Sequence, residues 1–208
     1  MTVEEYLAFD AAAPEGERYE YWDGDVIPVH GYHDDGVTAM AGASPAHNQI
    51  TVNLAAALHG SMTARGCRAG AGDQRVRAED GRYSYPDLVF VCGTPEYSDD
   101  NPPVLLNPTL IVEVASPSTA GRDRGTKMRA YTQTESLAEY GLVEATTAEV
   151  TRVVRTADGG WGLRFTFGRD AVLASDALGV SVALADVYRL VDDLAGDLAG
   201  DLAGLPSS

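Results

Sequence analysis

The sequence has 208 residues, of which 45% are hydrophobic and 22% charged, as expected for one globular domain with a buried core. Acidic residues outnumber basic ones by 31 to 15, which gives a formal net charge of −16. This balance argues against attachment to nucleic acid through overall charge, because phosphate binding needs positive charge. The N-terminus lacks the basic and apolar regions of a signal peptide, and no apolar run reaches membrane-spanning length, so we expect a cytoplasmic protein.

The first thirty residues are predicted to form a helix and a hairpin. Thr2 opens the helix 2–12 and Glu5 follows three residues later, which is the capping-box pattern. Residues 18–29 predict a hairpin that turns at Asp23-Gly24 in a type I′ turn. Strand alternation places Glu20 and Trp22 on one face, and exposure statistics alone would turn this glutamate to solvent. The polar residues 30–37 are expected to form a loop insertion.

A long helix is predicted from Ser44-Pro45, where serine caps the helix and proline occupies its first turn. Gly66 ends it, and His47 falls on its apolar stripe, where a packed histidine is the default expectation. The following segment, 68–78, predicts a strand in which Arg75 and Arg77 alternate with apolar neighbours. The stripe of the helix consists of Ile50, Leu54, Ala57 and Leu58.

Two short apolar runs, 85–91 and 109–115, are typical of strands that are buried on both faces. Each contains one carboxylate, Asp87 near the start of the first run and Glu113 within the second. A buried acid without a partner costs several kcal/mol, so each needs a cation or hydrogen-bond donors. If the two strands are neighbours, both carboxylates come to one place, where a hard divalent metal ion would fit.

Residues 123–131 predict a helix with Asp123 near its N-cap. Lys127 in this helix is the only lysine of the chain, since the other 14 of the 15 basic residues are arginines. One interpretation is that a compact, movable ammonium is needed beside the two acids. The other is that a single lysine among the basic residues has no special meaning, and spacing alone leaves both open.

The C-terminal part predicts a hairpin over 139–144 and 149–154, a strand over 161–167 and a short helix over 184–191. We expect one domain over residues 1–191. The tail, 192–208, repeats Asp-Leu-Ala-Gly, and because glycine costs a helix about 1 kcal/mol each time, a frayed or disordered tail is expected. Cys67 and Cys92 fall in predicted strands and are expected to be buried free thiols in a reducing compartment.

Several of these motifs together resemble the Uma-two family of restriction-endonuclease-like proteins, within the PD-(D/E)XK nuclease superfamily. They are Tyr-Pro-Asp87, Ile-Val-Glu113-Val-Ala-Ser-Pro-Ser-Thr, and Arg-Asp123-x-x-x-Lys127-x-x-x-Tyr131. In this family the lysine expected two residues after the second acid has moved to the following helix, and Lys127 stands at the moved position. The resemblance covers most of residues 2–191. It departs at Gly141 and Glu144, where the family usually has tryptophan and aspartate.

The resemblance implies an α/β (mixed α+β) restriction-endonuclease-like fold, in which a mixed central sheet is flanked by helices and carries N-terminal and C-terminal hairpins. It also implies a metal-dependent endonuclease that hydrolyses phosphodiester bonds in DNA. Asp87, Glu113 and the backbone carbonyl of Val114 would bind one or two Mg²⁺ ions, or Mn²⁺ in their place. Glu20 would complete the metal shell, Lys127 would orient the attacking water, and His47 would lie near the cleft.

The acidic balance keeps a second reading open, a catalytically silent nuclease fold that serves as an interaction or regulatory module. Against it, nine of the 15 basic residues cluster in 65–82 and 122–129, so a basic face on an acidic body is possible. We also expect a homodimer, since paired nucleases address the two strands of a duplex. The sequence leaves the target and the choice between DNA and RNA open. The candidate nucleic-acid contacts are Arg75, Arg77, Arg122, Arg124 and Arg129.

Overall fold

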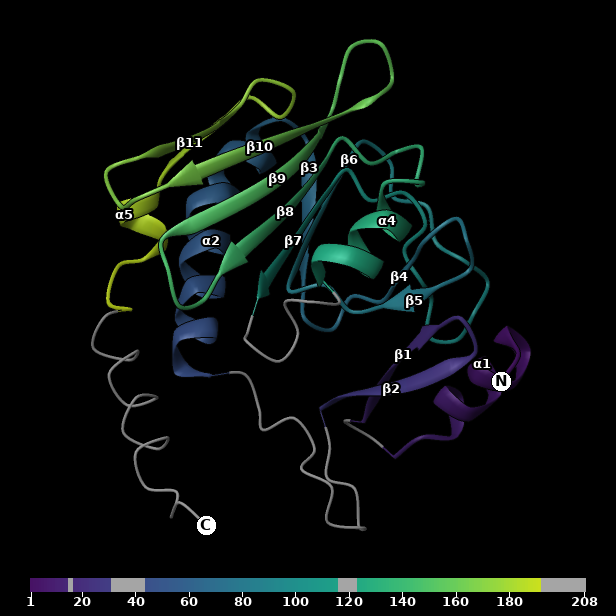
Figure 1. Cartoon of the computed structure of the whole chain (residues 1–208). Helices are drawn as coiled ribbons and strands as arrows, with labels where there is room; N and C mark the ends of the chain where they lie inside the picture. Colours follow the sequence, from purple (N-terminus) through teal and green to yellow (C-terminus); the bar gives the residue numbers. More distant parts are fainter. Residues whose placement is uncertain (15–16, 31–43, 116–122, 192–208) are drawn as a thin grey trace, which may run out of the picture.

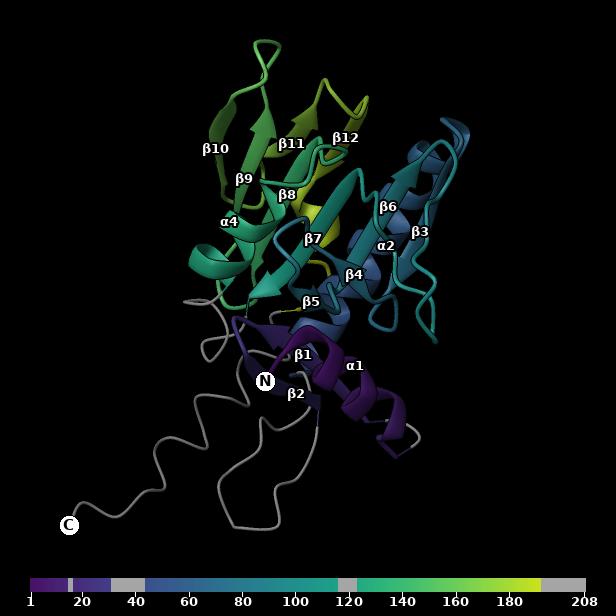
Figure 2. The ribbon, with the colours of Figure 1, turned by 90° about the vertical axis from the view of Figure 1, so that its right-hand side faces the viewer.

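The computed structural model describes residues 1–14, 17–30, 44–115 and 123–191, and its centre is a six-stranded mixed sheet (Figure 1). Strands β7 (Leu110–Ala115) and β8 (Glu139–Glu144) are parallel, whereas the other neighbouring pairs are antiparallel. Figure 2 shows the strand order from one edge to the other. The predicted mixed sheet with flanking helices is confirmed. The order is β10 (Trp161–Phe167), β9 (Glu149–Arg155), β8 (Glu139–Glu144), β7 (Leu110–Ala115), β6 (Leu88–Cys92) and β3 (Cys67–Ala71).

The two faces of this sheet bury different sets of side chains. Helix α2 (Pro45–Ala64), capped by Ser44, lies on one face and buries Ile50, Leu54 and Leu58 there. The short helix α4 (Met128–Tyr131) lies on the other face (Figure 1). Strands β6 and β7 are buried except at the half-buried Cys92, and they send alternate residues to the two sides, which is why their sequences are continuous apolar runs.

The N-terminal elements form a second, smaller sheet beside the main one. Helix α1 (Val3–Ala12) is capped by Thr2, which forms the expected capping box with Glu5. The hairpin of β1 (Arg18–Trp22) and β2 (Asp25–His30) turns at Asp23-Gly24, where both residues have positive φ as a type I′ turn requires. Strand β1 then pairs with β5 (Tyr83–Ser84), which continues to β4 (Val76–Arg77).

Three sequence predictions differ from the structure in their boundaries. The strand predicted over 68–78 is two strands, because the chain turns at Gly72, with φ of +46°, and leaves the main sheet after β3. The helix predicted over 123–131 starts with one π-helical turn, η1 (Asp123–Lys127), before α4. Beyond β10, a hairpin of β11 (Val172–Ser175) and β12 (Val180–Ala183) precedes α5 (Leu184–Val187), which is shorter than predicted.

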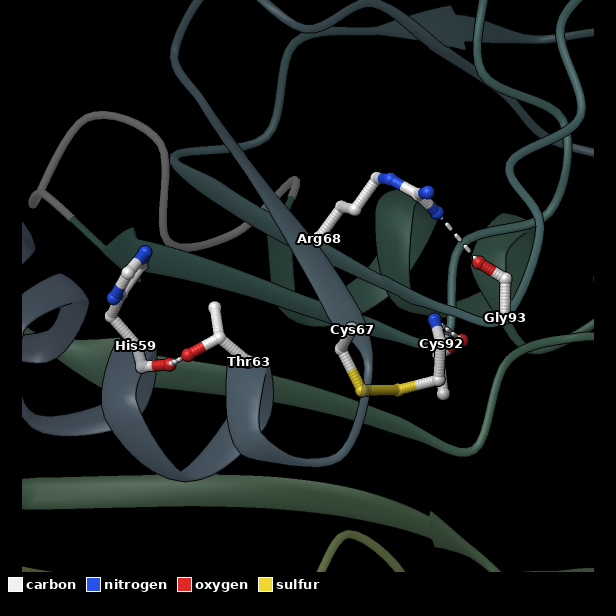
Figure 3. Close-up of a disulfide and its surroundings, with 7 residues drawn as sticks. His59, Thr63, Cys67, Arg68, Cys92 and Gly93 are labelled. Carbon is white, nitrogen blue, oxygen red and sulfur yellow. Dashed lines mark hydrogen bonds between the residues drawn. A yellow bond between two sulfur atoms is a disulfide. The ribbon is translucent and has the colours of Figure 1, made fainter.

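The expectation of free thiols is wrong, because Cys67 and Cys92 form a disulfide (Figure 3). Antiparallel pairing of β3 with β6 places the two cysteines directly opposite each other. Beside them the Arg68 guanidinium donates to the carbonyl of Gly93 at 2.9 Å. The bridge closes 25 residues of chain, and the chain-entropy model gives about 3.5 kcal/mol for a loop of that length.

Some predicted features fall outside the described residues, namely most of the 30–37 insertion and the tail 192–208. Within the described part of the chain, no helix is both long and apolar enough to cross a membrane.

Candidate active site

Glu113 lies in the middle of β7, and its neighbours determine which face it occupies. Ile111 and Ala115, two residues to either side, belong to the apolar cluster under α4, so strand alternation places the Glu113 carboxylate on the α4 face. The residue is only 4% exposed. A carboxylate so far from water needs a cationic or hydrogen-bonding partner to remain ionised.

That partner is Lys127, at the junction of η1 and α4. Its Nζ lies 3.1 Å from Oε1 of Glu113 and 3.0 Å from Oε1 of Glu20. Lys127 is itself buried, with 6% of its surface exposed. One ammonium therefore links two acids that come from different sheets, and the three side chains form a buried acid–lysine–acid triad.

Glu20 reaches this triad from β1 and is fixed by two further donors. The backbone N–H of Tyr85 donates to its Oε1 at 3.3 Å, and the indole N–H of Trp22 donates to its Oε2 at 3.0 Å. The strand alternation that puts Glu20 and Trp22 on one face is what makes the second bond possible. Glu20 is 4% exposed, so solvent statistics for glutamate do not describe it.

Asp87 stands where β6 and β7 separate. Their register pairs Leu88 with Val112, and one step further along the strands would place Asp87 opposite Glu113. Instead of continuing the ladder, the Asp87 side chain accepts a hydrogen bond at its Oδ2 from the backbone N–H of Val114 at 2.7 Å. The carboxylate is thereby tied to the residue that follows Glu113.

His47 approaches the same oxygen from the first turn of α2. Its Nε2 lies 3.2 Å from Asp87 Oδ2, and the two side chains are 14% and 22% exposed. The Ser44 hydroxyl accepts from the backbone N–H of His47 and so fixes the start of the helix that carries the imidazole. His47 therefore lies beside a candidate metal-binding acid.

Tyr131 is a member of this neighbourhood that the sequence did not assign to the site. It is fully buried and its hydroxyl is hydrogen-bonded to the Ser84 hydroxyl. Burial raises the pKa of the Tyr131 phenol well above its usual range, and the negative charge of Glu113 raises it further. The signal was its spacing, four residues after Lys127, which puts both on one side of a helical turn.

The candidate nucleic-acid contacts have different environments. Arg75 does not face solvent: it is 3% exposed, forms an ion pair with Asp10, and donates to the carbonyl of Pro102 at 3.1 Å. Arg77 is half-buried, and Arg129 is exposed on α4. Arg122 and the side chain of Arg124 lie outside the described residues.

The donor set at β6 and β7 fits a hard divalent cation. Asp87 Oδ1 forms no hydrogen bond with any described residue, and its side chain is 22% exposed. The part of the chain that is described contains no cluster of three or more His, Cys, Asp or Glu side chains arranged for a metal. Mg²⁺ usually keeps several waters and takes only one or two protein carboxylates, so a pair of acids is enough for it.

Comparison with known proteins assigns the chain to a family. Residues 3–185 match the family Uma2, described as "Putative restriction endonuclease". Two uncharacterized proteins of Synechocystis sp. are 30% and 31% identical over 174 and 172 residues, covering 83% and 82% of this chain and 90% of each relative.

A solved structure has the same fold. It is the crystal structure of "a putative nuclease belonging to DUF820" from Anabaena variabilis, with a TM-score of 0.69 and 14% identity. The match covers 92% of this chain and 99% of that one. At this identity the likeness concerns the fold alone. The family match over nearly the whole described domain goes further, and this chain belongs to the Uma2 family of restriction-endonuclease-like proteins.

Proposed function

We propose that this protein is a metal-dependent endonuclease that hydrolyses phosphodiester bonds in DNA. The observation that supports this best is the buried triad of Glu20, Lys127 and Glu113, with Asp87 held on the adjacent backbone of Val114. A structural ion pair needs one acid and one base, whereas here two acids share one lysine beside a third acid. Carboxylate oxygens grouped in this way are the ligands that a hard divalent cation prefers.

Asp87, Glu113 and the backbone carbonyl of Val114 would hold Mg²⁺ or Mn²⁺, and Glu20 would complete the shell directly or through water. A bound divalent ion supplies two things, a water with a lowered pKa and neutralisation of charge on the phosphate. The fit rests on the oxygen donors and on the open Oδ1 of Asp87. His47 contributes by fixing the orientation of the Asp87 carboxylate.

Lys127 acts on the water and the phosphate in this proposal. Glu20 and Glu113 hold its ammonium in one position, so the side chain does not have to change conformation to present its positive charge. It orients the attacking water, or it offsets the negative charge that develops on the phosphate oxygens. Arg77, Arg122, Arg124 and Arg129 are the remaining proposed contacts to the DNA backbone.

The test is cleavage of supercoiled plasmid DNA by purified protein with Mg²⁺, Mn²⁺ or EDTA. We expect metal-dependent cleavage that falls by about 100-fold or more in Asp87→Asn and in Lys127→Ala. The matched control is Glu139→Gln, because Glu139 is a buried acid on the other face of the sheet, paired with Arg152 at 3.1 Å. The proposal fails if cleavage persists in EDTA or if Asp87→Asn cuts as fast as the control.

A catalytically silent interaction module is the second candidate. The net charge of −16 and the burial of Arg75 favour it, because both reduce the positive charge available to a phosphate backbone. Absence of cleavage of duplex DNA, single-stranded DNA and RNA by the folded parent protein, with either metal, would support this module over the nuclease.

A further inference from the structure

Strand β10 is an edge of the central sheet that contains no proline and a single charged residue, Arg164. It pairs with β9 over seven residues without a register shift, and among the described residues no strand pairs with its outer side (Figures 1 and 2). Edge strands are normally blunted by proline, bulges or charge. The opposite edge, β3, likewise carries one exposed arginine, Arg68, whereas the outer strand of the small sheet, β2, contains Pro28.

One face of β10 is also apolar and exposed. Leu163, Phe165 and Phe167 alternate along the strand, so they share a face, and they are 51%, 55% and 60% exposed. The two phenylalanine rings are stacked, with centroids 6.0 Å apart and planes 14° from parallel. The Leu163 carbonyl accepts a hydrogen bond from the Arg164 guanidinium at 3.0 Å. Three large apolar side chains in a row along this edge strand nevertheless form a surface on which another strand can pair.

We propose that a second copy of this chain pairs with it through β10, as antiparallel strands about a two-fold axis at Phe165, so that the two sheets become one. In this register Leu163 faces the partner subunit's Phe167, and Phe165 faces the partner subunit's Phe165. Six apolar side chains are then contiguous, and cross-strand pairs of this kind stabilise a sheet.

The charges of β10 are compatible with pairing to a second copy, and they favour the register described above. Arg164 is the only charged residue of β10, so the strand itself contains no carboxylate that would repel a second copy of this acidic chain, whose net charge is −16. With the axis at Phe165, Arg164 lies opposite the partner subunit's Thr166. An axis at Arg164 would instead place two like charges directly opposite, which destabilises a sheet.

The pairing leaves each proposed active site whole. Glu113 pairs with Leu142, Leu142 with Thr151, and Thr151 with Phe165, so Glu113 and Phe165 lie on one cross-strand row. Seven strand spacings of about 4.8 Å would separate the two copies of Glu113, or about 34 Å. Hydrolysis at each site, on the function proposed above, therefore needs no residue from the partner.

Site-specific disulfides test the register, because Cys67 and Cys92 are bonded to each other and a new cysteine is then the single free thiol among the described residues. Under mild oxidation Phe165→Cys should form a covalent dimer, since cross-strand Cβ atoms lie about 5 Å apart. Leu163→Cys should not, because its two copies would be about 14 Å apart. The double variant Leu163→Cys/Phe167→Cys should link again. Val52→Cys, on an exposed apolar residue of α2, is the control.

Sedimentation of the full chain at roughly 100 µM gives the second readout. We expect a dimer for the parent and for Val52→Lys, and a monomer for Phe165→Lys. A monomeric parent, or equal linking of Phe165→Cys and Val52→Cys, would overturn the proposal. If the parent is a monomer and Phe165→Lys weakens its binding to a single-stranded oligonucleotide, the proposal is also overturned. Leu163, Phe165 and Phe167 would then be a surface on which bases stack. The rate of DNA cleavage per protomer by Phe165→Lys should stay within about two-fold of the parent rate. Failure of the dimer proposal can therefore be distinguished from failure of the proposed nuclease function.

Discussion

Replacing Lys127 with methionine separates a structural role of the triad from a catalytic one. Methionine keeps the length and the apolar stem of lysine, so the change removes charge without opening a cavity. It breaks two ion pairs of 3.0 and 3.1 Å and leaves Glu20 and Glu113, each 4% exposed, without their shared cation. Removing one partner of a buried pair costs about 3–5 kcal/mol.

The lower end of this range applies here. Glu20 keeps the N–H donors of Tyr85 and Trp22, which continue to stabilise its charge. We therefore expect Lys127→Met to lower the free energy of unfolding by about 3 kcal/mol at pH 8, which corresponds to about 6–12 °C in Tm for a chain of this size. Urea and thermal unfolding in EDTA measure this value, and Arg129→Met, on the exposed side of α4, should change little.

Mg²⁺ should partly reverse this loss. The variant has three acids and no lysine at the site, so it should bind the ion more tightly than the parent does. A tenfold gain in affinity would add about 1.4 kcal/mol of metal-dependent stability. Yet the variant should not cleave DNA, because the ammonium that acts on the water is missing. A variant within about 0.5 kcal/mol of the parent in EDTA, or one that still cuts DNA, would refute this reasoning.

Two further predictions concern the core. Gly141→Ala should raise Tm by about 2–4 °C, because alanine restricts the unfolded chain; its Cβ would meet both Val112 methyls at 3.8 Å and border a cavity of about 30 Å³. A lower Tm in the melt would contradict this. Above pH 10 stability should fall by about 1.4 kcal/mol per pH unit for each buried phenol, because folding raises the pKa of these groups and only the unfolded chain ionises them there. Phenolate absorbance during alkaline unfolding shows when each phenol ionises. If all tyrosines ionise before the chain unfolds, the prediction is wrong for Tyr6, Tyr131 and Tyr188.

The sequence by itself determined those features that depend on neighbours a few residues apart. The capping box at Thr2, the Asp23-Gly24 turn and the start of α2 at Ser44 follow from bonds within one turn of chain. The apolar runs of β6 and β7 likewise identify buried strands, because burial on both faces leaves no place for polar alternation. Asp87 and Glu113 are conspicuous as the acids within those runs.

Only the tertiary structure decided which distant groups meet. Lys127 is paired with Glu20, an acid more than 100 residues earlier in the chain, and no local pattern identifies that contact. Arg75 was indistinguishable from a surface arginine until Asp10, 65 residues away, was found beside it. The same holds for Cys67 and Cys92, whose bond depends on the register of β3 against β6. The physical reason is that burial and pairing are properties of packed elements, whereas sequence patterns report on single elements.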